Sequence, residues 1–189
     1  MPSAREGRAT ADPHEEPLLP GKSSSQTKGL LVLYDEALIG EIEPDDGEVT
    51  KPSRSRIGYI AQEAPSGDLT PEEVVLASAT ERAALLKELE TCTDIDRMGD
   101  VHERLLAIDA YSAPARAAKI LNGLGFDEEM QQRPVDSFSG GWKMRIALGA
   151  LLFSEPDILL LDEPSNHLDL EATLWLEDYI ARYEGTVVI

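Results

Sequence analysis

Two adjacent acids, Asp162 and Glu163, follow the short apolar run Ile158–Leu161. A run of this length and composition is typical of a strand covered on both faces, and α/β sheets place their ligands at the carboxyl ends of such strands. At that position Asp162 is suited to hold Mg²⁺, which prefers oxygen ligands. Glu163 is suited to orient and polarise a water molecule for attack on a γ-phosphate. The alternative is a solvated Asp-Glu-Pro turn after a core strand.

A serine and two glycines, Ser139–Gly141, come just before the strongly helical run Trp142–Phe153. Glycine lets the backbone approach a ligand closely, and the free N–H groups at the start of a helix attract anions. The motif therefore predicts a phosphate-binding helix start. The alternative is an ordinary helix capped by Ser139. The cations that follow, Lys143 and Arg145, could meet phosphate or RNA, or could form ion pairs with the acidic surface.

Strands and helices alternate along the chain and decide where these residues lie. Thr70 is suited to cap a helix that begins at Pro71, and the acids that follow favour the positive end of its dipole. From there to about Asp109 the chain is acidic and helical, and Gly99 and residues 91–96 divide it into a helical hairpin. The other expected elements are strands at Arg56–Ala61, Ile158–Leu161 and Thr186–Ile189, and helices at Thr80–Glu90, Val101–Ile108, Ala113–Leu124, Trp142–Phe153 and Leu170–Tyr183. This order predicts an α/β fold with a mostly parallel sheet and an inserted helical subdomain.

Length and charge limit the classes of protein to which the chain can belong. It has 189 residues and a formal net charge of −19, which disfavours a free-standing nucleic-acid binder because phosphate contacts need clustered Lys and Arg. No apolar run approaches the roughly 20 residues of a membrane span. The single cysteine, Cys92, cannot form an internal disulfide, which fits a reducing, cytoplasmic compartment.

Taken together, these motifs resemble the ATP-binding cassette (ABC) family. The order of a Ser-Gly-Gly helix start, an apolar strand ending in two acids and a polar turn is similar to the family's signature motif, Walker B strand and D-loop. Gln62 resembles its Q-loop glutamine. Trp142, the Asn-His-Leu-Asp ending and the acidic helical block are similar to the ABC-F subfamily, whose members usually carry two cassettes and act on ribosomes during translation. The matching segments are Phe138–Trp142, Ile158–Glu163 and Ser165–Asp169.

The resemblance implies a P-loop NTPase-like cassette that binds and hydrolyses ATP with Mg²⁺. Glu163 would be the catalytic base, and Asp162 and Gln62 would hold the metal. The residues expected at the nucleotide are Ser139, Gly140, Gly141, Gln62 and Asp169. The expected partners are a second ABC cassette and the ribosome, and the expected location is the cytoplasm.

The resemblance also implies a domain organisation. Residues 1–28 are polar and rich in proline, and we expect them to be disordered or non-homologous. Residues 29–189 would form a partial ABC ATPase domain, in which 71–136 is a helical subdomain or arm and 137–189 carries the signature helix, Walker B and D-loop. The family's switch histidine would follow the strand that starts at Thr186, so the domain is expected to be incomplete at both ends.

The P-loop pattern Gly-x-x-x-x-Gly-Lys-Ser/Thr is matched only at its tail, by the remnant Gly21, Lys22 and Ser23. Glu16 stands where the first glycine belongs, and the prolines at 17 and 20 have no backbone N–H to donate to phosphate. We therefore expect the chain on its own to bind ATP weakly or not at all. Two alternatives stay open: a degenerate or truncated cassette fragment without ATPase activity of its own, and the nucleotide-binding subunit of a transporter.

Overall fold

A three-stranded parallel sheet forms one layer of the protein in the computed structural model, which describes residue 50, residues 55–60 and residues 64–189. The strands are β1 (Ile57–Tyr59), β2 (Ile158–Leu160) and β3 (Thr186–Val188), in the order β1-β2-β3. Gly58 pairs with Leu159, which pairs in turn with Val187. The parallel sheet confirms the predicted fold class. All three strands are shorter than the expected ones.

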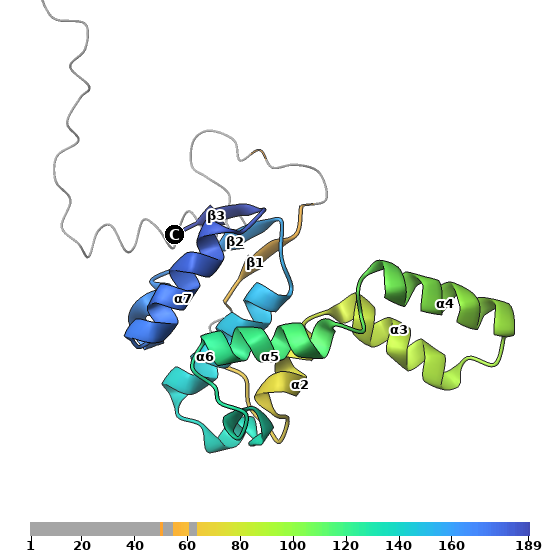
Figure 1. Cartoon of the computed structure of the whole chain (residues 1–189), viewed down its shortest axis with the longest axis horizontal. Helices are drawn as coiled ribbons and strands as arrows, with labels where there is room; N and C mark the ends of the chain where they lie inside the picture. The colour runs from red at the N-terminus through yellow and green to blue at the C-terminus, as the bar shows by residue number, and fades with distance from the viewer. Residues whose placement is uncertain (1–49, 51–54, 61–63) are drawn as a thin grey trace, which may run out of the picture.

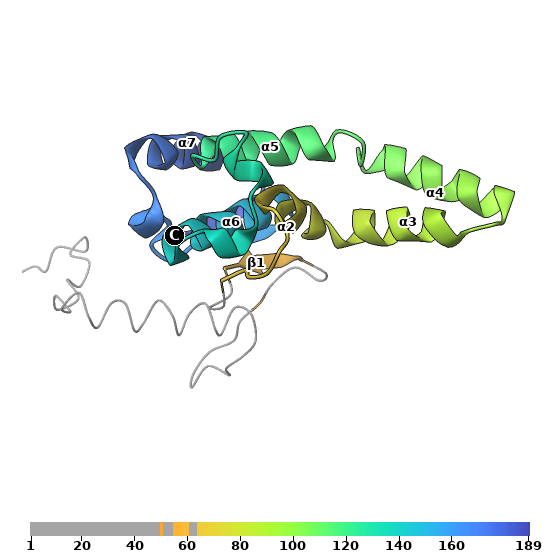
Figure 2. The ribbon, with the colours of Figure 1, turned by 90° about the horizontal axis from the view of Figure 1, so that it is seen from below.

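Four helices pack around this sheet and supply most of the core. They are α2 (Pro71–Ala77), α5 (Ala113–Gly123), α6 (Gly140–Phe153) and α7 (Leu170–Ala181). Figure 2 shows α5 and α7 along one side of the molecule, with α6 and α2 between them and β1. The main core joins buried side chains of these helices to β2, among them Leu121, Ile146, Leu152 and Leu159. Three short 3₁₀ turns connect them: η1 (Met130–Gln132), η2 (Val135–Ser137) and η3 (Pro164–His167).

The start of α2 is held by the cap that its sequence predicts. The Thr70 hydroxyl accepts a hydrogen bond from the backbone N–H of Glu73, and the Glu73 carboxylate accepts one from the backbone N–H of Thr70. This reciprocal pair satisfies two N–H groups that a helix start otherwise leaves without a partner. Pro71 occupies the first turn, where a missing N–H costs nothing.

A helical hairpin of α3 (Thr80–Thr91) and α4 (Ile95–Ala107) projects away from the rest of the protein (Figures 1 and 2). It has its own small core of Val101, Leu105 and Ala110, covered by leucines of α3. Two salt bridges link the helices, Arg97 to Glu88 and Arg104 to Glu81, each with an N–O distance of 2.6 Å. The hairpin therefore has a hydrophobic core separate from the main core, and charged side chains link its two helices.

The predicted break at Gly99 is wrong, because Gly99 lies inside α4. The chain turns earlier, where the Asp94 carboxylate accepts hydrogen bonds from the backbone N–H groups of Asp96 and Arg97 and starts the helix at Ile95. A glycine within a helix costs only about 1 kcal/mol relative to alanine. The cap and the contacts with α3 outweigh that cost, so the helix runs through it.

Candidate nucleotide site

The signature segment, Ser139–Gly141, begins α6 with its polar groups exposed. Ser139 has extended backbone angles, φ −68° and ψ 163°, and its hydroxyl makes no capping hydrogen bond. The alternative of an ordinary serine-capped helix is therefore wrong for this side chain. A side chain at Gly140 would meet no atom within 4 Å, so the approach to the first turn is open. The first N–H groups of an α-helix have no acceptor within the helix, so this end suits an anion.

The two acids emerge from the sheet directly after β2. The backbone N–H of Leu161 still donates to Val188 of β3, and Asp162 and Glu163 then follow at the carboxyl end of the strand, both exposed. This is the edge at which ligands bind in parallel α/β sheets. The position agrees with the one that the sequence predicts for both acids, and their metal and catalytic roles remain predictions.

Glu163 is held in a backbone conformation that is unusual for a residue other than glycine. Its φ of 43° and ψ of 52° lie in the left-handed region, which costs about 1–2 kcal/mol for an L-residue. The Asn166 side-chain amide donates to Glu163 Oε2 at 2.5 Å, and the Asn166 backbone N–H donates to the Glu163 carbonyl at 3.1 Å. Strained backbone of this kind gathers at functional sites, where the surrounding contacts maintain it. Here it fixes the direction in which the Glu163 side chain leaves the strand.

The D-loop segment, Ser165–Asp169, lies against the start of α6. A side chain at Gly141 would approach His167 Nδ1 to 3.9 Å. Arg145 Nε donates to the His167 carbonyl at 2.6 Å, and Arg145 Nη1 donates to Asp169 Oδ2 at 2.8 Å. These contacts bring the signature segment and the turn after the two acids together within one chain.

Asp169 uses both of its carboxylate oxygens inside the protein. Oδ1 accepts from the backbone N–H of Ala172 at 3.0 Å and caps α7, while Oδ2 faces Arg145. The Ala172 N–H, and after it the Arg145 guanidinium, hold the pKa of Asp169 below its usual value. The side chain is still half exposed, so the nucleotide contact that the resemblance implies remains a prediction.

The two cations after the signature segment form ion pairs within the chain. Lys143 Nζ lies 2.7 Å from Asp136 Oδ1, and this contact is the main cause of the lowered pKa of Asp136. Arg145 is buried, with its guanidinium 4.3 Å from the centre of the Trp142 ring and a hydrogen bond to the Leu124 carbonyl. Of the two alternatives that the sequence leaves open, the structure shows ion pairs.

Several predicted residues lie outside the part of the chain that the structure describes. These are the Q-loop residue Gln62 and the P-loop remnant Gly21, Lys22 and Ser23. Within the described part, no group of three or more His, Cys, Asp and Glu side chains could hold a metal ion. Asp162 would therefore hold Mg²⁺ together with other oxygen donors, and phosphate oxygens are the usual ones. The exposed carboxylate of Asp162 fits that chemistry.

The sequence prediction missed how the site residues hold one another. Asn166 supports Glu163, and Arg145 joins the D-loop segment to α6. The spacing of three residues between Glu163 and Asn166 could have indicated that the two side chains are in contact. Nothing in the sequence pairs Arg145 with a carbonyl 22 residues later.

Comparisons with known proteins agree on one family. A family profile described as ABC transporter matches residues 26–166. The "Probable ATP-binding protein YheS" of Escherichia coli (strain K12) is 39% identical over 184 residues, which cover 96% of this chain and 28% of that protein. "ABC transporter F family member 4" of Dictyostelium discoideum is 42% identical over 159 residues, covering 75% and 14%. The chain thus spans about a quarter or less of the length of these relatives.

Solved structures share the fold. The "ATP binding subunit of ABC transporter" has a TM-score of 0.55 at 18% identity, over 82% of this chain and 61% of that one. The "archaeal ribosome recycling factor aABCE1", solved in complex with "archaeal ribosomal stalk protein aP1", has a TM-score of 0.52 at 22% identity, over 82% and 25%. In the part of this chain that the structure describes, no helix has the length and apolar composition of a membrane crossing.

Proposed function

The chain belongs to the ATP-binding cassette family and has members of the F subfamily among its relatives, and from that premise we propose that it acts as part of an ATPase in which two cassettes face each other. Binding of ATP is a general property of this family. The single observation that carries the proposal is the exposed pair Asp162 and Glu163 at the carboxyl end of β2, with Glu163 fixed by Asn166. Glu155 has a similar φ, 45°, outside the site, so the support comes from the position of Glu163 at the carboxyl end of β2, where ligands of parallel sheets bind, together with its contact with Asn166.

In the proposed reaction the chain's residues divide the work. Glu163 orients a water molecule and accepts its proton as the water attacks the γ-phosphate, and the bond from the γ-phosphorus to the bridging oxygen breaks so that ADP leaves with that oxygen. Asp162, with Gln62, holds Mg²⁺, which neutralises charge on the phosphates when it is bound. The signature segment directs its N–H groups and the Ser139 hydroxyl at the γ-phosphate of an ATP held by the facing cassette. The open space around Gly140 supports that last role.

We extend the proposal to translation: the ATPase acts on ribosomes in the cytoplasm. Its support is the similarity to F-subfamily proteins, at 42% identity over three quarters of the chain for the Dictyostelium relative. Sedimentation through a sucrose cushion tests it. The chain carrying Glu163→Gln, paired with a second cassette, should sediment with ribosomes when ATP is present and stay in the supernatant without it. Equal sedimentation in both conditions would contradict this extension.

Phosphate release tests the hydrolytic step. The chain is mixed with a complete F-subfamily cassette whose own catalytic glutamate is replaced by glutamine, so that remaining turnover reports on Glu163. Glu163→Gln should then lower the rate at least 100-fold, the lower end for loss of a general base. The proposal would be overturned if the unaltered chain mixed with this partner released phosphate no faster than the partner alone.

Glu155 offers a matched control. It is a second exposed glutamate with a positive φ, 45°, and it lies just before β2, at the opposite end of the strand from Glu163. Glu155→Gln removes the same charge from the same kind of backbone, so it should leave the rate within about twofold of the unaltered chain. Equal losses for both variants would mean that charge or stability, and not the position of Glu163, explains the effect.

A further inference from the structure

The outer side of α4 carries an exposed apolar strip. Ile95, Gly99, His102 and Leu106 are spaced i, i+4, i+7 and i+11, which places them on one face of the helix. Ile95 is 83% exposed and Leu106 is 68% exposed. Tyr111, 57% exposed, extends the strip because its hydroxyl lies 3.0 Å from His102 Nδ1. No atom lies within 4 Å of a side chain built at Gly99, so another backbone can approach closely there.

A strip of carboxylates runs beside this apolar strip. Asp96, Asp100 and Glu103 have the same i, i+4, i+7 spacing, one residue further along the helix. In the described part of the chain, none of the three takes part in a salt bridge. The two arginines of α4, Arg97 and Arg104, are held by glutamates of α3. The cations of α4 therefore face its neighbour, and its outer side is apolar and negative.

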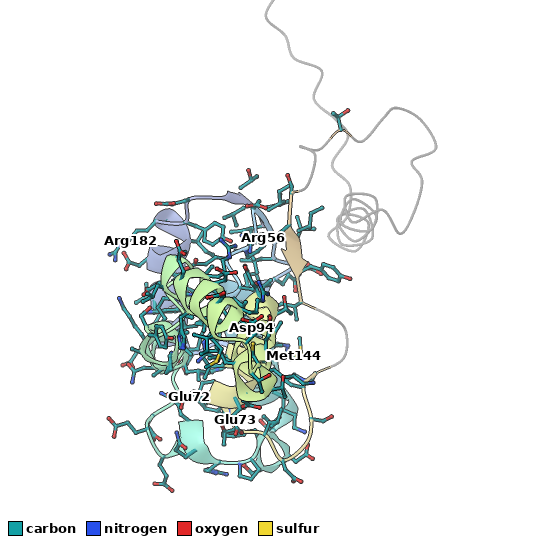
Figure 3. All side chains as sticks on the ribbon, turned by 90° about the vertical axis from the view of Figure 1, so that its right-hand side faces the viewer. Arg56, Glu72, Glu73, Asp94, Met144 and Arg182 are labelled. Carbon is teal, nitrogen blue, oxygen red and sulfur yellow. The ribbon has the colours of Figure 1, made fainter. Side chains whose placement is uncertain are left out.

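The remaining face of α4 is already covered. Val101 and Leu105 are buried against α3 in the small core of the hairpin. His102 and Leu106 of the outer strip directly follow these two buried residues in the sequence. Successive residues of an α-helix are about 100° apart around its axis, so the outer strip is rotated by about that angle from the buried face. It therefore lies outside the small core of the hairpin. Figure 3 views the molecule from the tip of the hairpin, where Asp94 is labelled, and Figures 1 and 2 show that the hairpin projects away from the sheet.

We propose that this outer face of α4, defined by Ile95, Gly99, His102, Leu106 and Tyr111 with the flanking acids, binds a basic amphipathic helix of a partner protein. Such a helix has apolar residues at i, i+4 and i+7, which fit the apolar strip, and Lys or Arg beside them, which meet the carboxylates. RNA does not fit this surface, because its phosphates would face the carboxylates of Asp96, Asp100 and Glu103. The close approach allowed at Gly99 suits helix against helix.

Fluorescence anisotropy with a defined probe tests this surface. The probe is a fluorescein-labelled peptide of about 20 residues, long enough to form a helix on binding, with Leu at i, i+4, i+7 and i+11 and Lys at the neighbouring positions. The full chain should bind it. Ile95→Asp and Leu106→Asp should each weaken binding at least about tenfold, and Glu103→Lys severalfold. Binding needs no ATP, so this result is independent of the proposed ATPase function.

Matched variants on α7 separate this surface from general attraction to an acidic protein. Leu170 is also exposed and apolar, and Glu177 is also an exposed helical acid. Leu170→Asp and Glu177→Lys should bind the peptide as the unaltered chain does, and all variants should keep the same circular dichroism melting curve. The proposal is overturned if a scrambled peptide of equal composition binds equally well, or if the α4 variants bind normally. It is also overturned if a labelled single-stranded RNA binds more tightly and loses binding in the same variants.

Discussion

Arg145 and Asp169 form a contact of 2.8 Å between Nη1 and Oδ2 that joins α6 to the start of α7. The Arg145 side chain is only 10% exposed, whereas that of Asp169 is 55% exposed. The same guanidinium also donates to the carbonyls of His167 and Leu124. One buried cation thus holds the D-loop segment, the end of α5 and the signature helix in fixed relation. The spacing between the signature segment and the D-loop segment depends on it.

Replacement of Asp169 by asparagine should therefore lower stability without removing the cap of α7. Asparagine caps a helix as well as aspartate does, so the hydrogen bond to Ala172 should survive. The charged contact with the buried Arg145 is lost, and we expect a cost of about 1–2 kcal/mol. Urea unfolding followed by circular dichroism measures it. Asp178→Asn, which breaks the exposed Arg182 pair on the same helix, should cost less than about 0.5 kcal/mol.

The effect of Asp169→Asn should depend on pH. The pKa of Asp169 is lower in the folded protein, so its carboxylate stabilises the fold at pH values above the unfolded pKa of about 3.9. That stabilisation is lost as the pH falls through the folded pKa. The difference in unfolding free energy between the unaltered chain and Asp169→Asn should be constant from pH 7 to 5 and shrink below about pH 4. A difference that stays constant down to pH 3 would exclude the charged contact as its source.

Local signals account for the parts of the fold that the sequence could predict. Thr70, Pro71 and Glu73 form a capping box through contacts within four residues, so their types are enough. The apolar run before Asp162 predicts a buried strand for the same reason. Gly99 misled the prediction because a weak local preference was outweighed by the cap at Asp94 and the packing of α4 on α3. Helix and strand boundaries that depend on tertiary contacts cannot be predicted from local composition.

The candidate site likewise combines features that the local sequence predicts with features that depend on tertiary contacts. Sequence order was enough to place Ser139 at a helix start and Glu163 at a strand end, because each follows from the element next to it. The left-handed backbone of Glu163 and the partners of Arg145 could not be predicted. They arise only when η3, which begins 24 residues after the start of α6, folds back against that helix.

Ser139→Ala should separate a ligand-binding serine from a capping one. The Ser139 hydroxyl makes no capping bond, so its loss should change the unfolding free energy by less than about 0.5 kcal/mol. In a mixture with a complete cassette whose own catalytic glutamate is intact, the same change should lower phosphate release, because a donor to the γ-phosphate of the ATP held by that cassette is gone. Thr70→Ala is the converse control: it removes a real cap, should cost about 1 kcal/mol, and should leave turnover per folded molecule unchanged. A Ser139→Ala variant that is as destabilised as Thr70→Ala would show that the serine caps α6 after all.

The chain on its own should bind ATP weakly. Gly21, Lys22 and Ser23 match only the tail of a P-loop, and an acid at position 16 would repel phosphate. Isothermal titration calorimetry of the isolated chain with ATP and Mg²⁺ should show no binding tighter than about 100 μM. Lys22→Ala should not change the titration. Micromolar affinity that disappears in Lys22→Ala would contradict this prediction and assign the remnant a working role.

Gly123→Ala should destabilise the protein, because α5 and α7 approach too closely there for any side chain. A Cβ at Gly123 would lie 2.0 Å from Cε2 of the Trp175 indole, so the ring would have to move. Overpacking of this kind costs about 1–3 kcal/mol.

Gly99→Ala is the matched control: its Cβ would meet no atom within 4 Å, and it should stabilise α4 by about 0.5–1 kcal/mol. Combining Gly123→Ala with Trp175→Leu should recover part of the loss in urea unfolding, since the two effects are then not additive. Strict additivity would place the strain elsewhere.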